Sequence, residues 1–151
     1  MREELLLAHD LASSFGWELN PDYEALTVVA KMLAHTGDPF VLEIRCDNYK
    51  EIPPLIEFID PDSGERGSRR AYPQAVGSFF HTSGPCICAP FNRKAYQAFV
   101  PGAPHGDWSP ADWMTSTANG VTWSNFSKLG DMLGLVYRHL SRPELYQGRM
   151  T

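Results

Sequence analysis

Two cysteines, Cys86 and Cys88, stand in the stretch HTSGPCICAPFNRKAY, which covers residues 81–96. A cysteine can act as a nucleophile, bind a metal, form a redox pair or fill a core, and this stretch alone favours none of these roles. In extended chain both thiols would point the same way, because side chains two residues apart share a face. Polar side chains that can assist a nucleophilic thiol lie in and after the stretch, namely His81, Asn92, Arg93, His105 and Asp107.

Length and composition predict one soluble domain that spans residues 1–151, with 43% apolar and 21% charged residues. Its apolar runs are too short to cross a bilayer, and its start does not resemble a secretory signal, so we expect a cytoplasmic protein without a membrane partner. The net charge of −5 argues against a nucleic-acid partner. Three cysteines are an odd number, which argues against a disulfide framework.

The elements that must carry the cysteine stretch begin with a helix over residues 2–15, which Gly16 ends. Extended chain follows over 17–19 and 26–33, and then a strand over 40–46 whose alternation places Cys46 on the core face. Another strand covers 55–59 and ends in the turn at 60–64. This order predicts a meander of antiparallel strands.

Residues 66–122 are rich in Gly, Pro, Ser and aromatic residues, so we expect mostly irregular loop there. So long a loop in a compact domain is usually functional. From Ser124 an apolar face at helical spacing predicts a second helix, which Pro143 stops. The predicted fold class is therefore α+β.

The segment YKEIPPLIEF, residues 49–58, resembles a motif of ubiquitin-conjugating enzymes. That family carries a Tyr, three residues, Pro-Pro, one residue, Ile or Val, one residue and Phe, and this chain matches at Tyr49, Pro53, Pro54, Ile56 and Phe58. Lys50 stands where the family has a further proline. The family fold is an N-terminal helix, a four-stranded meander, an active-site cysteine on an extended loop and further helices, which is the order predicted above.

Downstream, Gly84, Ile87 and Cys88 resemble the family's Gly-x-Ile-Cys-Leu pattern, and residues 108–111 read Trp-Ser-Pro-Ala as in the family. The resemblance covers roughly residues 2–140 and is closest to divergent prokaryotic members. The family's His-Pro-Asn tripeptide before the cysteine is missing, and only His81 stands in that region. Either another donor replaces the tripeptide asparagine, or the domain is a relative that binds ubiquitin-like proteins without catalysis.

The resemblance implies that Cys88 accepts a ubiquitin-like protein as a thioester from an activating enzyme and passes it to an amine of a target protein, without a cofactor. Several prokaryotic systems of this kind serve defence against phage. Cys88 follows Ile87 as the family cysteine follows its isoleucine, which favours Cys88 over Cys86. Gly84, however, lies one residue further back than the family spacing, which leaves Cys86 open.

Each of the other polar residues has a role in such chemistry. Asn92 can donate to the oxyanion. Arg93 can lower a thiol pKa or orient a carboxyl group, and His81 can stand in for the tripeptide. His105 with Asp107 can form an oriented base. Each of them also has a structural alternative, such as capping a turn or lying in solvent.

Three further alternatives remain at this stage. Cys86, Cys88, His81 and His105 can supply four zinc ligands, although their spacing is atypical of zinc sites. Cys86 and Cys88 can form a redox pair, although no helix N-terminus is predicted beside them. The chain can also be a non-enzymatic binding module of the same fold.

Overall fold

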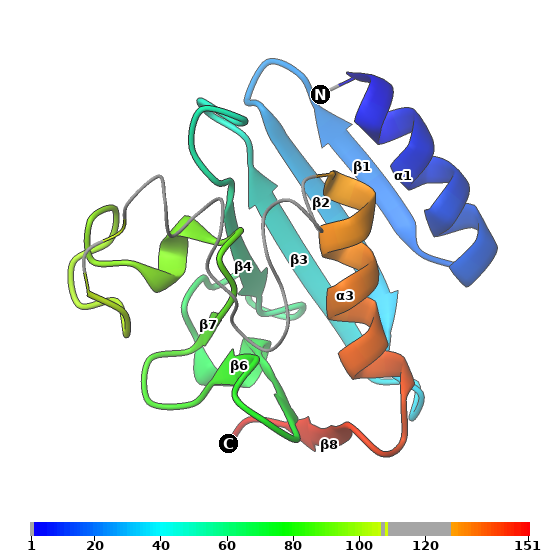
Figure 1. Cartoon of the computed structure of the whole chain (residues 1–151). Coiled ribbons are helices and arrows are strands. Elements are labelled where there is room, and N and C mark those ends of the chain that lie inside the picture. The colour runs from blue at the N-terminus through cyan, green and yellow to red at the C-terminus, as the bar shows by residue number, and fades with distance from the viewer. Residues whose placement is uncertain (1, 107, 109–127) are drawn as a thin grey trace.

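The computed structural model describes residues 2–106, 108 and 128–151. At its centre is a four-stranded antiparallel sheet whose order follows the chain, formed by β1 (Glu18–Asp22), β2 (Thr27–Leu33), β3 (Pro39–Arg45) and β4 (Leu55–Ile59) (Figure 1). The register aligns the buried residues of neighbouring strands, as in the pair Ile44 and Ile56. The predicted meander is confirmed, and Cys46 lies in the core as expected, with 5% of its surface exposed.

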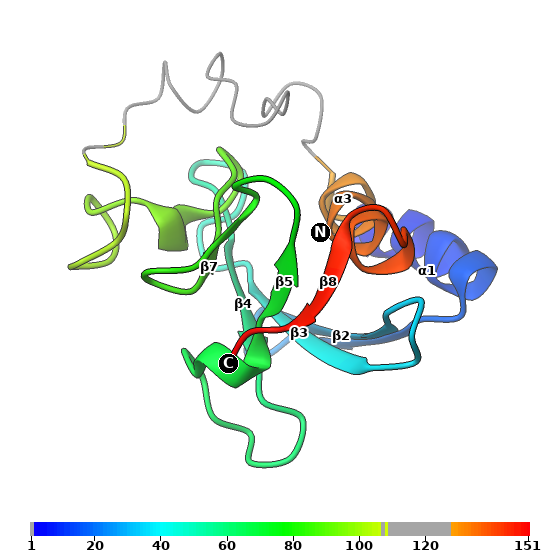
Figure 2. The same cartoon turned by 90° about the horizontal axis from the view of Figure 1, so that it is seen from below.

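Two helices cover one face of this sheet, α1 (Arg2–Phe15) and α3 (Leu129–Ser141), and they pack against each other (Figure 2). α1 has the predicted bounds, and Gly16 ends it with a φ of 73°, which suits glycine. α3 buries the predicted apolar face, and residues 124–127 of the predicted helix lie outside the described residues. No helix among the described residues is long and apolar enough to span a membrane.

The segment after β4 contains more regular structure than the prediction of an irregular loop allowed. Its described residues form two 3-10 turns, η1 (Arg69–Ala71) and η2 (Arg93–Ala95), and three short strands, β5 (Pro73–Ala75), β6 (Phe80–His81) and β7 (Cys86–Ile87). β6 and β7 pair as a small hairpin, and β5 pairs with the C-terminal strand β8 (Tyr146–Arg149). Strands of two or three residues are too short to show an alternation of apolar and polar residues. They can therefore be identified only from the strands with which they pair in the structure.

The other face of β3 and β4 carries buried charges that fasten the later segment to the sheet. Glu43 and Glu57 lie opposite each other in the register and are 7% and 2% exposed. Arg66 donates two hydrogen bonds to Glu43, and Lys94 of η2 pairs with Glu57. Buried carboxylates require such partners, so these ion pairs hold residues 66 and 94 against the sheet.

Candidate functional site

Cys88 lies at a tight turn that follows β7 directly. Its N–H donates to the carbonyl of Phe79 at 2.7 Å, which extends the β6–β7 hairpin by one contact. The N–H of Ala89 then turns back to the carbonyl of Ile87 at 3.1 Å, with Cys88 between them. A hydrogen bond across three residues is the mark of a γ-turn, so the thiol is carried at a bend in the backbone.

Asn92 fastens this turn to the central sheet. Its side-chain oxygen accepts from the N–H of Ile56 at 2.8 Å, and its Nδ2 donates to the carbonyl of Ile87 at 2.9 Å. The residue is completely buried. A buried amide bonded at both ends acts as a cross-link between β4 and the residue before Cys88. Donation to an oxyanion would require Asn92 to release Ile87, and that predicted role stays a prediction.

Arg93 is turned toward the segment between β3 and β4. Its guanidinium pairs with the Asp47 carboxylate at 2.5 Å and donates to the Asp47 carbonyl at 2.9 Å. The side chain is nearly buried, with 8% of its surface exposed. This charge is therefore balanced by Asp47, and the predicted action of Arg93 on a thiol or a carboxyl group also stays a prediction.

The sulfur of Cys88 lies 2.6 Å from Nε2 of His105. Two backbone bonds hold the imidazole there, because the N–H of His105 donates to Ala95 at 2.9 Å and its carbonyl accepts from Gln97 at 3.0 Å. The ring also lies beside Tyr96, with 5.4 Å between the ring centroids. A thiol in contact with a held imidazole has the geometry of an activated nucleophile with its base.

Both partners of this pair favour their neutral forms. Burial raises the pKa of the Cys88 thiol above its ordinary value. Burial, and then repulsion from the nearby His81, lowers the pKa of His105 below its usual range. The resting site is therefore a thiol hydrogen-bonded to a neutral imidazole, which can take the proton when the sulfur attacks.

His81 lies beside this pair on β6, opposite Cys86 of β7. Its Nδ1 accepts a hydrogen bond from the N–H of Gly84 at 3.3 Å. Of the predicted site residues, the structure thus brings Cys88 and His105 into contact and places His81 on the neighbouring strand β6. Asp107, the expected partner of His105, lies outside the described residues.

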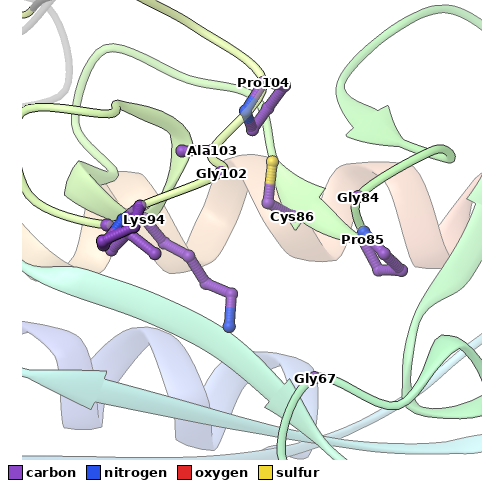
Figure 3. A pocket seen from close by; sticks show the side chains of 10 residues that line it. Gly67, Gly84, Pro85, Cys86, Lys94, Gly102, Ala103 and Pro104 are labelled. Carbon is purple, nitrogen blue, oxygen red and sulfur yellow. The ribbon is translucent and has the colours of Figure 1, made fainter.

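The second cysteine differs from the first in its surroundings. Cys86 is 2% exposed, and burial, followed by the neighbouring Cys88 sulfur, raises its pKa to about 12. Its thiol lines a pocket of about 190 Å³, shown in Figure 3. Cys88 is the cysteine whose sulfur contacts an imidazole, so the geometry favours Cys88 as the nucleophile.

A metal centre has less support. Among the described residues, no three His, Cys, Asp or Glu side chains lie close enough together to hold a metal ion.

The sequence predicts His105 as a helper of Cys88, but it does not predict the direct contact between them. Spacing along the chain does not show which loop residue lies against which thiol.

Known proteins add no second line of support for this site. Comparisons of the chain with protein-family models, with curated proteins and with solved structures found no match.

Proposed function

We propose that this chain is a conjugating enzyme for a ubiquitin-like protein, in which Cys88 carries the modifier as a thioester. The observation that carries the proposal is the contact of 2.6 Å between the Cys88 sulfur and Nε2 of His105. A conjugating enzyme needs a cysteine nucleophile, and Cys88 has an imidazole at its sulfur that is able to act as a base. The bacterial setting and a role in antiphage defence rest on the sequence resemblance alone.

The element order supports the same proposal. A helix, a four-stranded antiparallel meander and then a cysteine on a turn occur in this order, and a further helix follows. Tyr49 also has a defined structural role, since its hydroxyl donates to Glu4 of α1 at 2.7 Å and thereby links the Tyr-x-x-x-Pro-Pro segment to the first helix.

The chemistry can be written with its protons balanced. His105 takes the thiol proton as the Cys88 sulfur attacks the carbonyl carbon of the modifier's C-terminal thioester. The activating enzyme's thiolate leaves and takes that proton. In the second step the target amine attacks the new thioester, His105 accepts the amine proton, and Cys88 leaves as a thiolate that recovers the proton. Because Cys88 is 6% exposed, both steps require the site to open for a protein substrate.

The test is intact mass spectrometry of the chain mixed with a candidate activating enzyme, its ubiquitin-like protein and ATP. We expect an adduct of the modifier's mass that a reducing agent removes. Cys88→Ala should abolish the adduct, whereas Cys86→Ala and Cys46→Ala should keep it. No adduct with an activating enzyme that has itself been charged with the modifier, or an adduct that survives in Cys88→Ala, would contradict the proposal.

A non-catalytic binding module is the second candidate, and one observation favours it. The N–H groups of Cys88 and Ala89 and the Nδ2 of Asn92 all donate within the protein, so none of these three is ready to stabilise an oxyanion. The two candidates differ for Cys88→Ser. The enzyme should lose transfer or trap an oxyester, while a binding module should bind its modifier with unchanged affinity and form no adduct in either version.

A further inference from the structure

The pocket beside Cys86 has walls of small, apolar residues. Three prolines and three glycines form most of it, together with Val100 and Ala103. Two polar groups reach it, the Cys86 thiol and Lys94 (Figure 3). The Lys94 ammonium is already paired with the buried Glu57 carboxylate, so its charge is balanced. The interior therefore suits an uncharged, aliphatic group.

The pocket and the Cys88–His105 pair are built from the same two segments of chain. Pro104 of the pocket wall directly precedes His105. Cys86 is two residues before Cys88, and the two sulfurs are close enough to influence each other electrostatically. Cys88 and His105 do not line the pocket themselves, but each is within two residues of one that does.

The volume of the pocket indicates how much of an acyl chain it can cover. An apolar cavity of about 150 Å³ in another protein accommodates benzene. A pocket of about 190 Å³ therefore accommodates an acyl chain of about four to six carbons. Cys88 is 6% exposed, which favours a small donor over a bulky one.

We propose that this pocket is an acyl-group site, and that Cys88 accepts short-chain acyl groups from small-molecule thioesters without any protein partner. This activity shares Cys88 and His105 with the function proposed above but needs neither a modifier nor an activating enzyme. The pocket sets which acyl groups react, and the thiol–imidazole pair supplies the chemistry.

The transfer is balanced without a further reactant. Nε2 of His105 takes the proton of the Cys88 thiol, and the sulfur forms a bond to the carbonyl carbon of the donor. The carbon–sulfur bond of the donor breaks, and the leaving thiolate takes the proton from His105. Water or an amine can then attack the acyl group on Cys88, give its proton to His105, and return Cys88 as a thiol. No atom changes oxidation state.

The first experiment mixes the full chain with acetyl, butyryl and octanoyl thioesters of N-acetylcysteamine and measures adduct mass and thiol release. We expect acetyl and butyryl adducts on Cys88, and a rate at least tenfold lower for octanoyl. Cys88→Ala should form no adduct, and Cys46→Ala should react as wild type does. Equal rates for butyryl and octanoyl, or adducts spread over lysines, would overturn the proposal.

The second experiment fills the pocket. Gly84 has open space where a side chain would begin and no left-handed φ, so Gly84→Leu introduces bulk without backbone strain. We expect it to slow butyryl transfer at least tenfold while acetyl transfer changes little. Ser83→Leu is the matched control, because Ser83 is exposed, neighbours Gly84 and lies outside the pocket lining. Unchanged butyryl transfer in a folded Gly84→Leu protein would remove the pocket from the proposal.

The third readout is the pH profile of acetyl transfer. In wild type the rate should fall as the pH drops through the lowered pKa of His105. In His105→Asn it should instead keep rising with pH toward the raised thiol pKa. Matching profiles would overturn the proposal. A modifier adduct without small-thioester transfer would defeat this inference alone, and the reverse result would defeat only the proposed conjugating function.

Discussion

The Cys88 sulfur and Nε2 of His105 lie 2.6 Å apart although the two residues are 17 positions apart in the chain. The β6–β7 hairpin holds Cys88 through its N–H. The end of η2 holds His105 through Ala95, and the segment after η2 holds it through Gln97. The contact therefore depends on two separately anchored backbones rather than on local sequence.

This contact predicts that His105 controls the reactivity of Cys88. His105→Asn should slow alkylation of Cys88 by iodoacetamide at pH 7 about tenfold or more, because the buried thiol then lacks an acceptor for its proton. Peptide mass mapping of Cys88 over time measures the rate. His9→Asn, at an exposed position of α1, is the matched control and should leave the rate unchanged. Equal rates in His105→Asn and wild type would show that the imidazole does not act as the base.

Asn92 predicts a large loss of stability when its amide is removed. Asn92→Ala leaves the N–H of Ile56 without a partner and frees the carbonyl of Ile87 on one side. Buried groups left unpaired in this way cost about 1–3 kcal/mol each, so we expect a loss of about 2–4 kcal/mol in urea unfolding. Asn20→Ala, on the exposed side of β1, should change stability by less than about 0.5 kcal/mol. A small effect at Asn92 would mean that the turn at Cys88 is held by other contacts.

The lowered pKa of Glu4 predicts that the free energy of unfolding depends on pH. Burial alone would raise its pKa, but hydrogen bonds from Lys50, Tyr49 and the N–H of Leu129 hold the pKa below its ordinary value. The charged form is thus favoured in the folded chain. Its contribution is complete above the unfolded pKa of about 4.5 and is lost as the pH falls through the lower folded value.

Glu4→Gln should therefore lower the free energy of unfolding at pH 7 by about 1.5–3 kcal/mol, the value typical of hydrogen bonds to a charged group. The difference from wild type should shrink as the pH falls below 4, where the wild-type carboxylate also becomes neutral. Urea unfolding at both pH values measures this. Glu3→Gln is the control on the neighbouring exposed residue, and an equal effect there would contradict the assignment.

The position of Gly134 predicts that its replacement by alanine stabilises the fold. It lies inside α3, where a methyl group would meet only Leu11 at an ordinary contact distance of 3.7 Å. Gly134→Ala should raise stability by about 0.5–1 kcal/mol, because alanine favours helix over glycine by that amount. Gly37→Ala should instead lower stability, since Gly37 has a φ of 90° that disfavours a side chain. Thermal unfolding of both variants checks the two signs, and stabilisation by both would contradict the backbone argument.

The longer helices and strands of this protein were predictable from the sequence because their apolar residues recur at a regular spacing. The helix at 2–15 and the strand at 55–59 were predicted with the bounds that the structure has. Alternation along β3 also placed Cys46 in the core. By contrast, β8 was not predicted, since its four residues show no alternation and its partner β5 lies about 70 residues earlier.

The candidate site, too, was predictable from the sequence only in part. Composition and spacing were enough to name Cys88 and its helper residues, because residue type alone determines which groups can act as nucleophile or base. Only tertiary structure decided that His105 meets Cys88, that Arg93 is paired with Asp47, and that Asn92 ties the thiol turn to β4. These contacts join segments from different parts of the chain, and which loop atoms meet depends on how the buried groups of the whole core pack and find partners.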